Sequence, residues 1–209
     1  MRIRISGGAG YIGSFLIKKL VEEGHEVVSI DDESIGDYRH LRELGLDEKA
    51  ELLIGDIRDK ERLVEIWAKC DAVVHLAALS NLEICNEQPE EAISVNIFGT
   101  HHVMEAVKEL DIPKVVFCSS ASIYGEPTKL PVTEDSPLDA LNLYGITKIA
   151  GEKIVNSYWM NDKIETVNLR FGNLYGVGLY TQWYAVIPKF VKQAIDGKEI
   201  TIYGDGEYT

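Results

Sequence analysis

Hydrophobic residues along the chain gather in short runs that alternate with segments of helical spacing. Between the runs, apolar residues recur every three or four positions, as they do on one face of a helix. The runs occupy residues 2–6, 25–30, 51–54, 72–76, 114–118 and 165–169. Strands that alternate with helices in this way are joined by right-handed crossovers. The pattern therefore predicts an α/β fold with a doubly wound parallel sheet.

The helical segments have recognisable boundaries in several places. A first helix is expected over residues 11–23, and a later one begins at Asp59, whose side chain can cap its first turn. Two longer helices are expected over residues 89–110 and 144–160. After Arg170 the texture changes to a loop with several glycines, and a helix over about 188–195 and a strand over 199–203 are expected to follow.

A glycine-rich run, Gly7-Gly8-Ala9-Gly10-Tyr11-Ile12-Gly13, lies between the first strand and the first helix. Its spacing Gly8-x-Gly10-x-x-Gly13 fits the dinucleotide fingerprint of the Rossmann fold, in which the backbone approaches a pyrophosphate at the start of a helix. The next strand leads to Asp31, 18 residues past Gly13. A carboxylate there is expected to accept hydrogen bonds from the adenosine ribose. The alternative is a structural glycine turn in another α/β protein.

A tyrosine and a lysine, Tyr144 and Lys148, are four residues apart in an expected helix and therefore share one face. Tyrosine has a reference pKa of about 10, so action as a base near neutral pH needs roughly 4 kcal/mol of stabilisation of the phenolate. One cation about 5 Å away supplies on the order of 3 kcal/mol. A second positive charge, the oxidised nicotinamide ring of NAD, is the natural complement.

Composition and charge narrow the classes of function. A chain of 209 residues suffices for one well-buried domain, or for a domain with a fragment of a second. The net charge of −13 argues against a nucleic-acid partner. The three cysteines form no CxxC pair, so neither a disulfide framework nor a metal site is expected. The first strand begins at residue 2 and no run approaches membrane-spanning length, which favours a cytoplasmic location without a membrane partner.

Taken together, these residues resemble the extended short-chain dehydrogenase/reductase family, and within it the NAD-dependent nucleotide-sugar epimerases and dehydratases. The resemblance runs in order over residues 1–209. It implies that NAD is contacted by the glycine turn, by the ends of the following strands and by the catalytic pair. The cofactor residues so implied are Gly7, Gly10, Tyr11, Ile12, Gly13, Asp31, Asp56, Ile57, Leu76, Ala77, Ala78, Asn96, Tyr144 and Lys148.

The same resemblance implies a nucleotide-diphosphate sugar as substrate. Ser120 takes the place of the catalytic hydroxyl beside Tyr144 and Lys148, and Ser120 and Ser122 are expected near the sugar. Asn173 is expected at the substrate diphosphate and Tyr203 near the base. The implied domains are an NAD-binding domain over residues 1–175, which carries the catalytic residues, and the beginning of a substrate-binding region over 176–209.

Several assignments keep an alternative. Asp56 can simply cap a turn, Asn96 can be a satisfied buried amide, and Tyr175 and Tyr203 can be packing aromatics. Ser119 and Ser122 lie too close to Ser120 for position alone to exclude either. His75, at the end of an apolar strand, is expected to be a core or strand-end histidine rather than a base.

Departures from the family pattern sharpen the expected activity. Ala121 and Ser122 stand where the dehydratases have Asp-Glu, which favours epimerisation at C4 through a transient 4-keto intermediate. Leu143 replaces a frequent proline, and residues 176–183 lack the usual Pro-Arg, so the sugar stays open. The family continues well past residue 209, so the substrate region is expected to be truncated.

The competing interpretations are a dehydratase or dehydrogenase of the same family and, in another class, a non-catalytic dinucleotide-binding module. In the family, the two long helices that correspond to 89–110 and 144–160 form a homodimer interface. The apolar residues expected there are Ile93, Ile97, Met104, Val107, Ile149, Ile154, Tyr158 and Trp159. Packing of these residues on the sheet of their own chain is the alternative.

Overall fold

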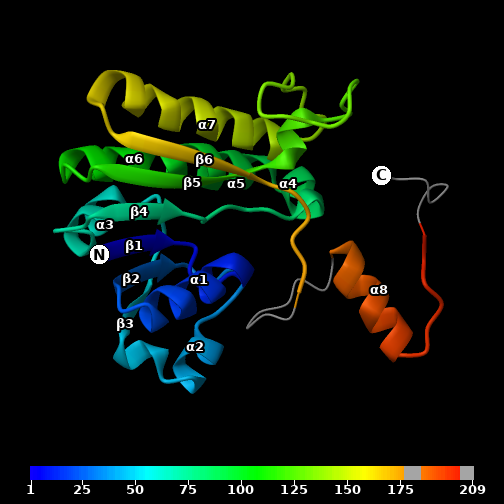
Figure 1. The fold of residues 1–209 in the computed structure, drawn as a ribbon, viewed down its shortest axis with the longest axis horizontal. Helices are drawn as coiled ribbons and strands as arrows, with labels where there is room; N and C mark the ends of the chain where they lie inside the picture. Colours follow the sequence, from blue (N-terminus) through cyan, green and yellow to red (C-terminus); the bar gives the residue numbers. More distant parts are fainter. Residues whose placement is uncertain (177–184, 203–209) are drawn as a thin grey trace.

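A sheet of six parallel strands forms the centre of the computed structural model, which describes residues 1–176 and 185–202 (Figure 1). The strands lie in the order β3-β2-β1-β4-β5-β6. Their bounds are β1 Arg2–Ser6, β2 Glu26–Asp31, β3 Ala50–Ile54, β4 Ala72–His75, β5 Lys114–Ser120 and β6 Glu165–Phe171. The order reverses between β1 and β4, and the carboxyl ends of strands at such a point are where doubly wound sheets bind ligands. The predicted fold class is confirmed.

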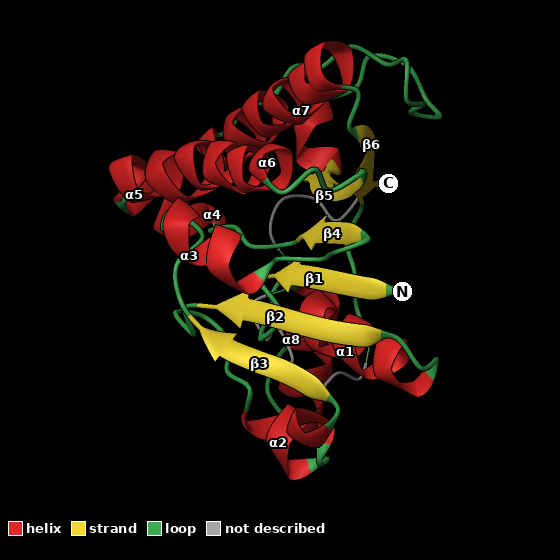
Figure 2. Ribbon diagram, turned by 90° about the vertical axis from the view of Figure 1, so that its left-hand side faces the viewer, coloured by secondary structure: helices red, strands yellow, loops and turns green. Residues whose placement is uncertain are grey.

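Helices pack against both faces of this sheet and form a core on each (Figure 2). One core contains side chains of α1 Tyr11–Glu22, α2 Arg39–Glu43 and the short turn η1 Leu46–Glu48. The other contains side chains of α3 Lys60–Ile66, α6 Thr100–Glu109 and α7 Leu143–Asp162. Asp59 caps α3 by accepting a hydrogen bond from the backbone nitrogen of Arg62 at 2.9 Å, as predicted.

The expected helix over 89–110 is correct in extent but not regular. It follows the short helix α4 Leu82–Glu87 and consists of α5 Pro89–Ile93, a π-helical turn η2 Ser94–Gly99, and α6. The irregular turn is the part of this segment that carries Asn96, whose amide bonds to the backbone of Leu79. Such π-helical turns occur frequently at functional sites.

Among the described residues after β6 there is one helix, α8 Val186–Ile195, close to the predicted one. The strand predicted over 199–203 is wrong for residues 199–202, which form no strand, and residue 203 lies outside the described residues. A strand needs a neighbour with which to share hydrogen bonds, and Ile200 and Ile202 are exposed. Among the described helices, none combines the length and the apolar composition needed to cross a membrane.

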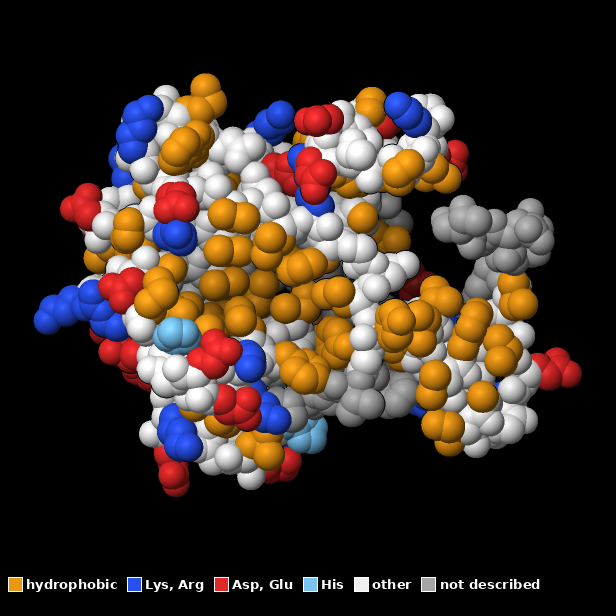
Figure 3. Space-filling model, viewed as in Figure 1, with side chains coloured by type: hydrophobic (Ala, Val, Ile, Leu, Met, Phe, Trp, Pro, Cys, Tyr) orange, Lys and Arg blue, Asp and Glu red, His pale blue; other side chains and the backbone are white. Residues whose placement is uncertain are grey.

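One face of the sheet shows a gathering of hydrophobic side chains near β6 (Figure 3). On β6, Asn168 and Arg170 face α7, and the alternate residues Val167 and Leu169 are exposed.

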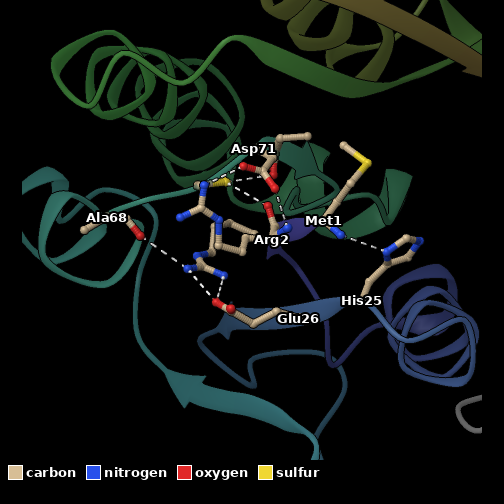
Figure 4. A network of polar contacts seen from close by, with 9 residues as sticks. Met1, Arg2, His25, Glu26, Ala68 and Asp71 are labelled. Carbon is tan, nitrogen blue, oxygen red and sulfur yellow. Dashed lines mark hydrogen bonds and ion pairs between the residues drawn. The ribbon is translucent and has the colours of Figure 1, made fainter.

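The amino-terminal edge of the sheet is held by ion pairs that involve the first strand (Figure 4). Arg2 binds Asp71 through its backbone nitrogen at 2.8 Å and its guanidinium at 2.7 Å. Arg4, although buried, pairs with Glu26 at 3.1 Å and donates to the carbonyl of Ala68 at 3.3 Å. These contacts join the beginnings of β1, β2 and β4. The candidate functional residues lie at the other, carboxyl ends of the strands.

Candidate active site

The turn between β1 and α1 has a shape that only glycine allows at two positions. Gly7 has a φ of +82°, and a Cβ atom there would lie 2.5 Å from the backbone nitrogen of Ala77. A Cβ atom on Gly13 would collide with the carbonyl oxygen of Gly7. Glycine at position 7 lets the turn lie directly against the segment after β4, and glycine at position 13 lets the first turn of α1 lie against the backbone of Gly7 and Gly8.

Gly10 has a different surrounding. A Cβ atom there would meet only the carbonyl oxygen of Gly7, at an ordinary 3.6 Å, so the described protein does not fill the space in front of it. Gly10 is the N-cap of α1, and Tyr11 and Ile12 begin the helix. An open backbone surface at the positive end of a helix suits a pyrophosphate, and the turn therefore fits a dinucleotide.

Asp31, at the end of β2, is tied to the glycine turn. Its Oδ2 accepts a hydrogen bond from the backbone nitrogen of Ala9 at 3.0 Å, and its Oδ1 accepts one from Glu33 at 2.9 Å. Burial raises the pKa of Asp31 to about 6, although these two hydrogen bonds act to lower it. The carboxylate is therefore mostly ionised at neutral pH and can accept hydrogen bonds from a ribose.

Asp56 has its side chain engaged within its own turn. It accepts a hydrogen bond from the backbone nitrogen of Arg58 at 2.8 Å and pairs with the Arg58 guanidinium, which also contacts Glu91 at 2.9 Å. Burial raises the pKa of Asp56, but the contacts with Arg58 outweigh it and the pKa is lowered. This is the turn-capping role that the sequence left open. Ile57 is buried, and its side chain lies where a Cβ atom on Gly99 would otherwise point.

Asn96 joins the segment after β4 to the catalytic helix. Its Oδ1 accepts from the backbone nitrogen of Leu79 at 2.7 Å, and its Nδ2 donates to the carbonyl of Leu79 and to Thr147 Oγ1, both at 3.0 Å. The amide is buried and satisfied, as the alternative interpretation expected. Leu76 and Ala77 donate their backbone N–H groups to the carbonyl of Ser6 at 2.9 and 3.0 Å, which holds residues 76–78 beside the glycine turn.

The hydroxyl groups of Ser120 and Ser122 meet where β5 ends, next to the start of α7. The Oγ atoms of Ser120 and Ser122 are 2.9 Å apart, and the backbone nitrogen of Ser122 donates to Ser120 Oγ at 3.2 Å. A Cβ atom on Gly145 would lie 2.7 Å from the carbonyl oxygen of Ser122. The glycine thus lets the first turn of α7, which carries Tyr144, lie directly against the serine turn η3 Ala121–Tyr124.

Lys148 is buried behind this junction. Its Nζ donates to the carbonyl of Cys118 at 2.7 Å and lies 5.0 Å from the centre of the Phe117 ring and 5.8 Å from the centre of the Tyr144 ring. Only 3% of Lys148 is exposed, and burial lowers its pKa. The structure thus places the Lys148 side chain beside the Tyr144 ring, on the helix face that the two residues share.

Ser119 and His75, two further candidates from the sequence, form hydrogen bonds within the core. Ser119 is buried, and its Oγ donates to Glu152 Oε1 at 2.5 Å. His75 is buried between Ser6 Oγ at 2.7 Å and Thr100 Oγ1 at 2.9 Å, and burial lowers its pKa to about 3. His75 is therefore a neutral core histidine, as expected. In the described part of the chain, no group of His, Cys, Asp and Glu is placed to hold a metal.

The residues expected at the substrate are only partly described. Asn173 is exposed in the loop after β6, and so is Tyr175, which is therefore not a buried packing aromatic. The loop approaches the glycine turn, because the hydroxyl of Tyr11 donates to the carbonyl of Gly176 at 3.3 Å. Tyr203 lies outside the described residues.

Sequence reasoning missed a buried ion pair next to the site. Arg170 on β6 donates to both carboxylate oxygens of Glu152 on α7, at 2.9 and 2.8 Å. One signal was available, since Glu152 lies four residues after Lys148 and so shares its helix face. The pairing with Arg170 depends on the sheet register, which sets Arg170 opposite Ser119.

Comparison with known proteins agrees with this geometry. Residues 3–209 match the NAD dependent epimerase/dehydratase family. The chain belongs to that family. This confirms the resemblance predicted from the sequence, and the family's dependence on NAD agrees with the expected cofactor.

Individual relatives of this family member include epimerases and dehydratases. The UDP-glucose 4-epimerase of Lactobacillus helveticus is 36% identical over 215 residues, which are 98% of this chain and 64% of the relative. The solved UDP-N-acetylglucosamine 4-epimerase from Methanobrevibacter ruminantium, in complex with UDP-N-acetylmuramic acid, is 30% identical with a TM-score of 0.91, over 99% of this chain and 66% of its own. A dTDP-glucose 4,6-dehydratase from Streptomyces venezuelae with NAD bound is 28% identical, with the same TM-score and coverage. The chain thus spans about two thirds of the length of these relatives.

Proposed function

We propose that the protein is an NAD-dependent enzyme that inverts a nucleotide-diphosphate sugar at C4, as a UDP-glucose 4-epimerase does. The observation that carries the proposal is Lys148, buried between the Tyr144 ring and the Cys118 carbonyl and next to the Ser120–Ser122 pair. This group lies at the carboxyl ends of the parallel strands, as does the glycine turn that follows β1. A binding module that performs no chemistry would not need a buried lysine beside a tyrosine.

The roles of the side chains follow from their positions. Tyr144, as phenolate, takes the proton of the sugar 4-hydroxyl, and Ser120 hydrogen-bonds the same oxygen and can relay the proton. Lys148 supplies the positive charge that favours the phenolate. NAD, when bound, would supply the group that accepts the hydride of C4 and gives it back. Asp31 and the open backbone at Gly10 would hold its ribose and pyrophosphate.

Epimerisation is favoured over dehydration by the turn after Ser120. Loss of water from a sugar needs an acid and a base besides the tyrosine. The turn supplies Ala121 and Ser122 in these places, and Ser122 Oγ is hydrogen-bonded to Ser120. A dehydratase or dehydrogenase of the same family is the second candidate, because a dehydratase is among the chain's relatives.

The substrate contacts extend beyond the described site. Asn173 in the loop after β6 would hold the diphosphate and Tyr203 would lie near the base, so residues 176–209 begin the substrate-binding region next to the NAD-binding domain of residues 1–175. The contact between Tyr11 and Gly176 supports this assignment, since it brings the loop beside the cofactor turn.

The partners and location that we propose are a homodimer in the cytoplasm, without nucleic acid or membrane. Ile93, Phe98, Ile146 and Trp159 are exposed on the segment from α5 to η2 and on α7, which supports self-association. Of the residues expected in the interface, Met104 and Val107 are instead buried in the core of the chain. Three free cysteines suit a reducing compartment, and a net charge of −13 does not suit nucleic acid.

A product analysis tests the proposed function. The purified protein is incubated with NAD and UDP-galactose, and nucleotide sugars and NADH are measured together. We expect UDP-glucose to form without net NADH. Accumulation of NADH would indicate a dehydrogenase, and a 4-keto-6-deoxy product would indicate a dehydratase.

A further inference from the structure

An ion pair between a partly buried Arg170 and a buried Glu152 lies next to the residues that flank Ser120 and Ser122. Arg170 binds Glu152 through two parallel hydrogen bonds, and only 3% of the Glu152 side chain is exposed. Burial raises the pKa of Glu152, but the hydrogen bonds from Arg170 and Ser119 outweigh it and hold the pKa below its ordinary value. The pair is therefore ionised, and its bidentate geometry fixes the direction of both side chains.

Glu152 holds the end of β5 from the side of α7. Its Oε1 accepts the hydrogen bond of Ser119, the residue directly before Ser120. One helical turn earlier, Lys148 donates to the carbonyl of Cys118. Two successive turns of the catalytic helix thus bind two successive residues of the strand that presents the catalytic serine.

Arg170 reaches the other side of the same junction. Its Nη1 donates to the hydroxyl of Tyr124 and to the carbonyl of Glu134, both at 2.8 Å. Tyr124 ends the turn that contains Ser122, and Glu134 lies in the segment that leads to Asn142, the N-cap of α7. Besides binding each other, Arg170 and Glu152 therefore form hydrogen bonds with segments that flank Ser120, Ser122 or Tyr144.

We propose that Arg170 and Glu152 are positioning residues, which set the distance between Tyr144 and the Ser120–Ser122 turn by acting through Ser119, Tyr124 and Glu134. The inference concerns the same site and so rests on the proposed function. A role in stability alone explains the pair less well, because an apolar pair of similar volume usually stabilises a core as much as a buried ion pair does. Catalytic groups need support of this kind to keep their geometry.

The test replaces both charges together. Arg170→Met with Glu152→Leu leaves neither charge without its partner and removes the contacts of the pair with Ser119, Tyr124 and Glu134, while the hydrogen bond from Lys148 to Cys118 stays. Lys114→Met with Glu165→Leu is the matched control, because this exposed pair, at 3.1 Å, joins β5 to β6 at the end of β6 that is opposite to Arg170. We expect kcat of the first double variant to fall roughly 10²-fold, with KM for UDP-galactose, affinity for NAD and melting temperature retained. The control is expected to keep the kcat of the unmodified protein.

Two single variants grade the effect. Arg170→Lys keeps the charge but cannot make the two parallel hydrogen bonds, and Tyr124→Phe removes only the contact with the serine turn. Both should lower kcat by less than the double variant does. If the double variant does not fold, Arg170→Lys decides: an unchanged kcat overturns the inference, as does a fall in kcat matched by an equal loss of NAD affinity.

A second measurement needs no turnover, so that failure of this inference and failure of the proposed function are distinguishable. The ultraviolet absorbance of tyrosinate is titrated in each protein and in its Tyr144→Phe counterpart, and the difference reports the ionisation of Tyr144. We expect the midpoint to move to higher pH in the Arg170→Met/Glu152→Leu protein and not in the control. An unchanged midpoint, even in a protein that epimerises no sugar, overturns the inference.

Discussion

Two halves of the same sheet edge are constructed in opposite ways. The cofactor half, around Gly7, Gly10 and Gly13, owes its shape to missing side chains and to backbone hydrogen bonds such as the one from Ala9 to Asp31. The hydroxyl half owes its shape to three long charged side chains between α7, β5 and β6. Lys148 and Glu152 are buried, and Arg170 is partly buried.

The difference decides how each half can fail. Added atoms should damage the cofactor half, because backbone already lies at contact distance there. Lost atoms should damage the hydroxyl half, because each buried charge there has several partners that would remain unpaired. Substitutions in the cofactor half should therefore change the affinity for NAD, and substitutions in the hydroxyl half should change kcat.

The largest effect is expected for the tyrosine of the hydroxyl half. Tyr144→Phe removes the proposed base and keeps the ring, so NAD binding should persist while turnover falls by roughly 10²-fold or more. Steady-state kinetics with UDP-galactose, beside calorimetry with NAD, checks both parts. Retention of more than about a tenth of the rate would assign the base to another residue.

Removal of the buried cation should produce a loss that depends on pH. Lys148 Nζ lies 5.8 Å from the centre of the Tyr144 ring, and one cation about 5 Å from a phenolate oxygen is worth on the order of 3 kcal/mol. In Lys148→Met the tyrosine needs a higher pH to ionise, so the rate at neutral pH should fall roughly 10²-fold and recover as pH rises. A pH profile of kcat/KM tests this, and a loss that is equal at all pH values would show that Lys148 acts only by packing.

In the cofactor half, two alanine substitutions should separate folding from binding. Gly13→Ala forces a Cβ atom against the Gly7 carbonyl and should lower the free energy of unfolding by about 1 to 3 kcal/mol. In Gly10→Ala the new Cβ atom makes only an ordinary contact, so the free energy of unfolding should be unchanged, whereas the affinity for NAD should fall. Denaturant unfolding and calorimetry measure the two quantities. Undiminished NAD affinity in Gly10→Ala would contradict the placement of the pyrophosphate.

Cofactor choice should depend on Asp31, with a smaller effect. Asp31, Asp32 and Glu33 place negative charge where the 2′-phosphate of NADP would lie, so NAD should bind more tightly than NADP. Asp31→Asn should lower the affinity for NAD about tenfold, because a charged hydrogen bond is lost. It should also reduce the preference for NAD over NADP. Comparable dissociation constants for both cofactors in the unmodified protein would refute this arrangement.

The smallest expected effect is a pH dependence of stability. The pKa of Asp31 in the folded protein, about 6, exceeds its ordinary value of 3.8. Its contribution to stability without cofactor is therefore fully present below that ordinary value and is lost as pH rises through 6. Unfolding measured from pH 4 to 7 should show this decline, and Asp31→Asn should flatten it. An identical slope in both proteins would mean that Asp31 is not buried.

The two halves also differ in how far the sequence could predict them. The glycine spacing, Asp31 and the Tyr144–Lys148 pair are local patterns, and a local pattern carries its own geometry. The pairing of Arg170 with Glu152 depends on strand register, and the irregular turn at Asn96 depends on hydrogen bonds to Leu79 and Thr147. Residues 199–202 show the same limit, since a strand pattern needs a partner that the local sequence does not supply.

The most direct test of the account follows the hydrogen at C4. UDP-galactose that carries deuterium at C4 is incubated with the protein and NAD, and the products are examined by mass spectrometry and NMR. The account predicts UDP-glucose with deuterium retained at C4 and no accumulation of reduced cofactor. Deuterium that is lost to solvent, or that accumulates in NADH, would contradict the transfer and return of hydride at one carbon.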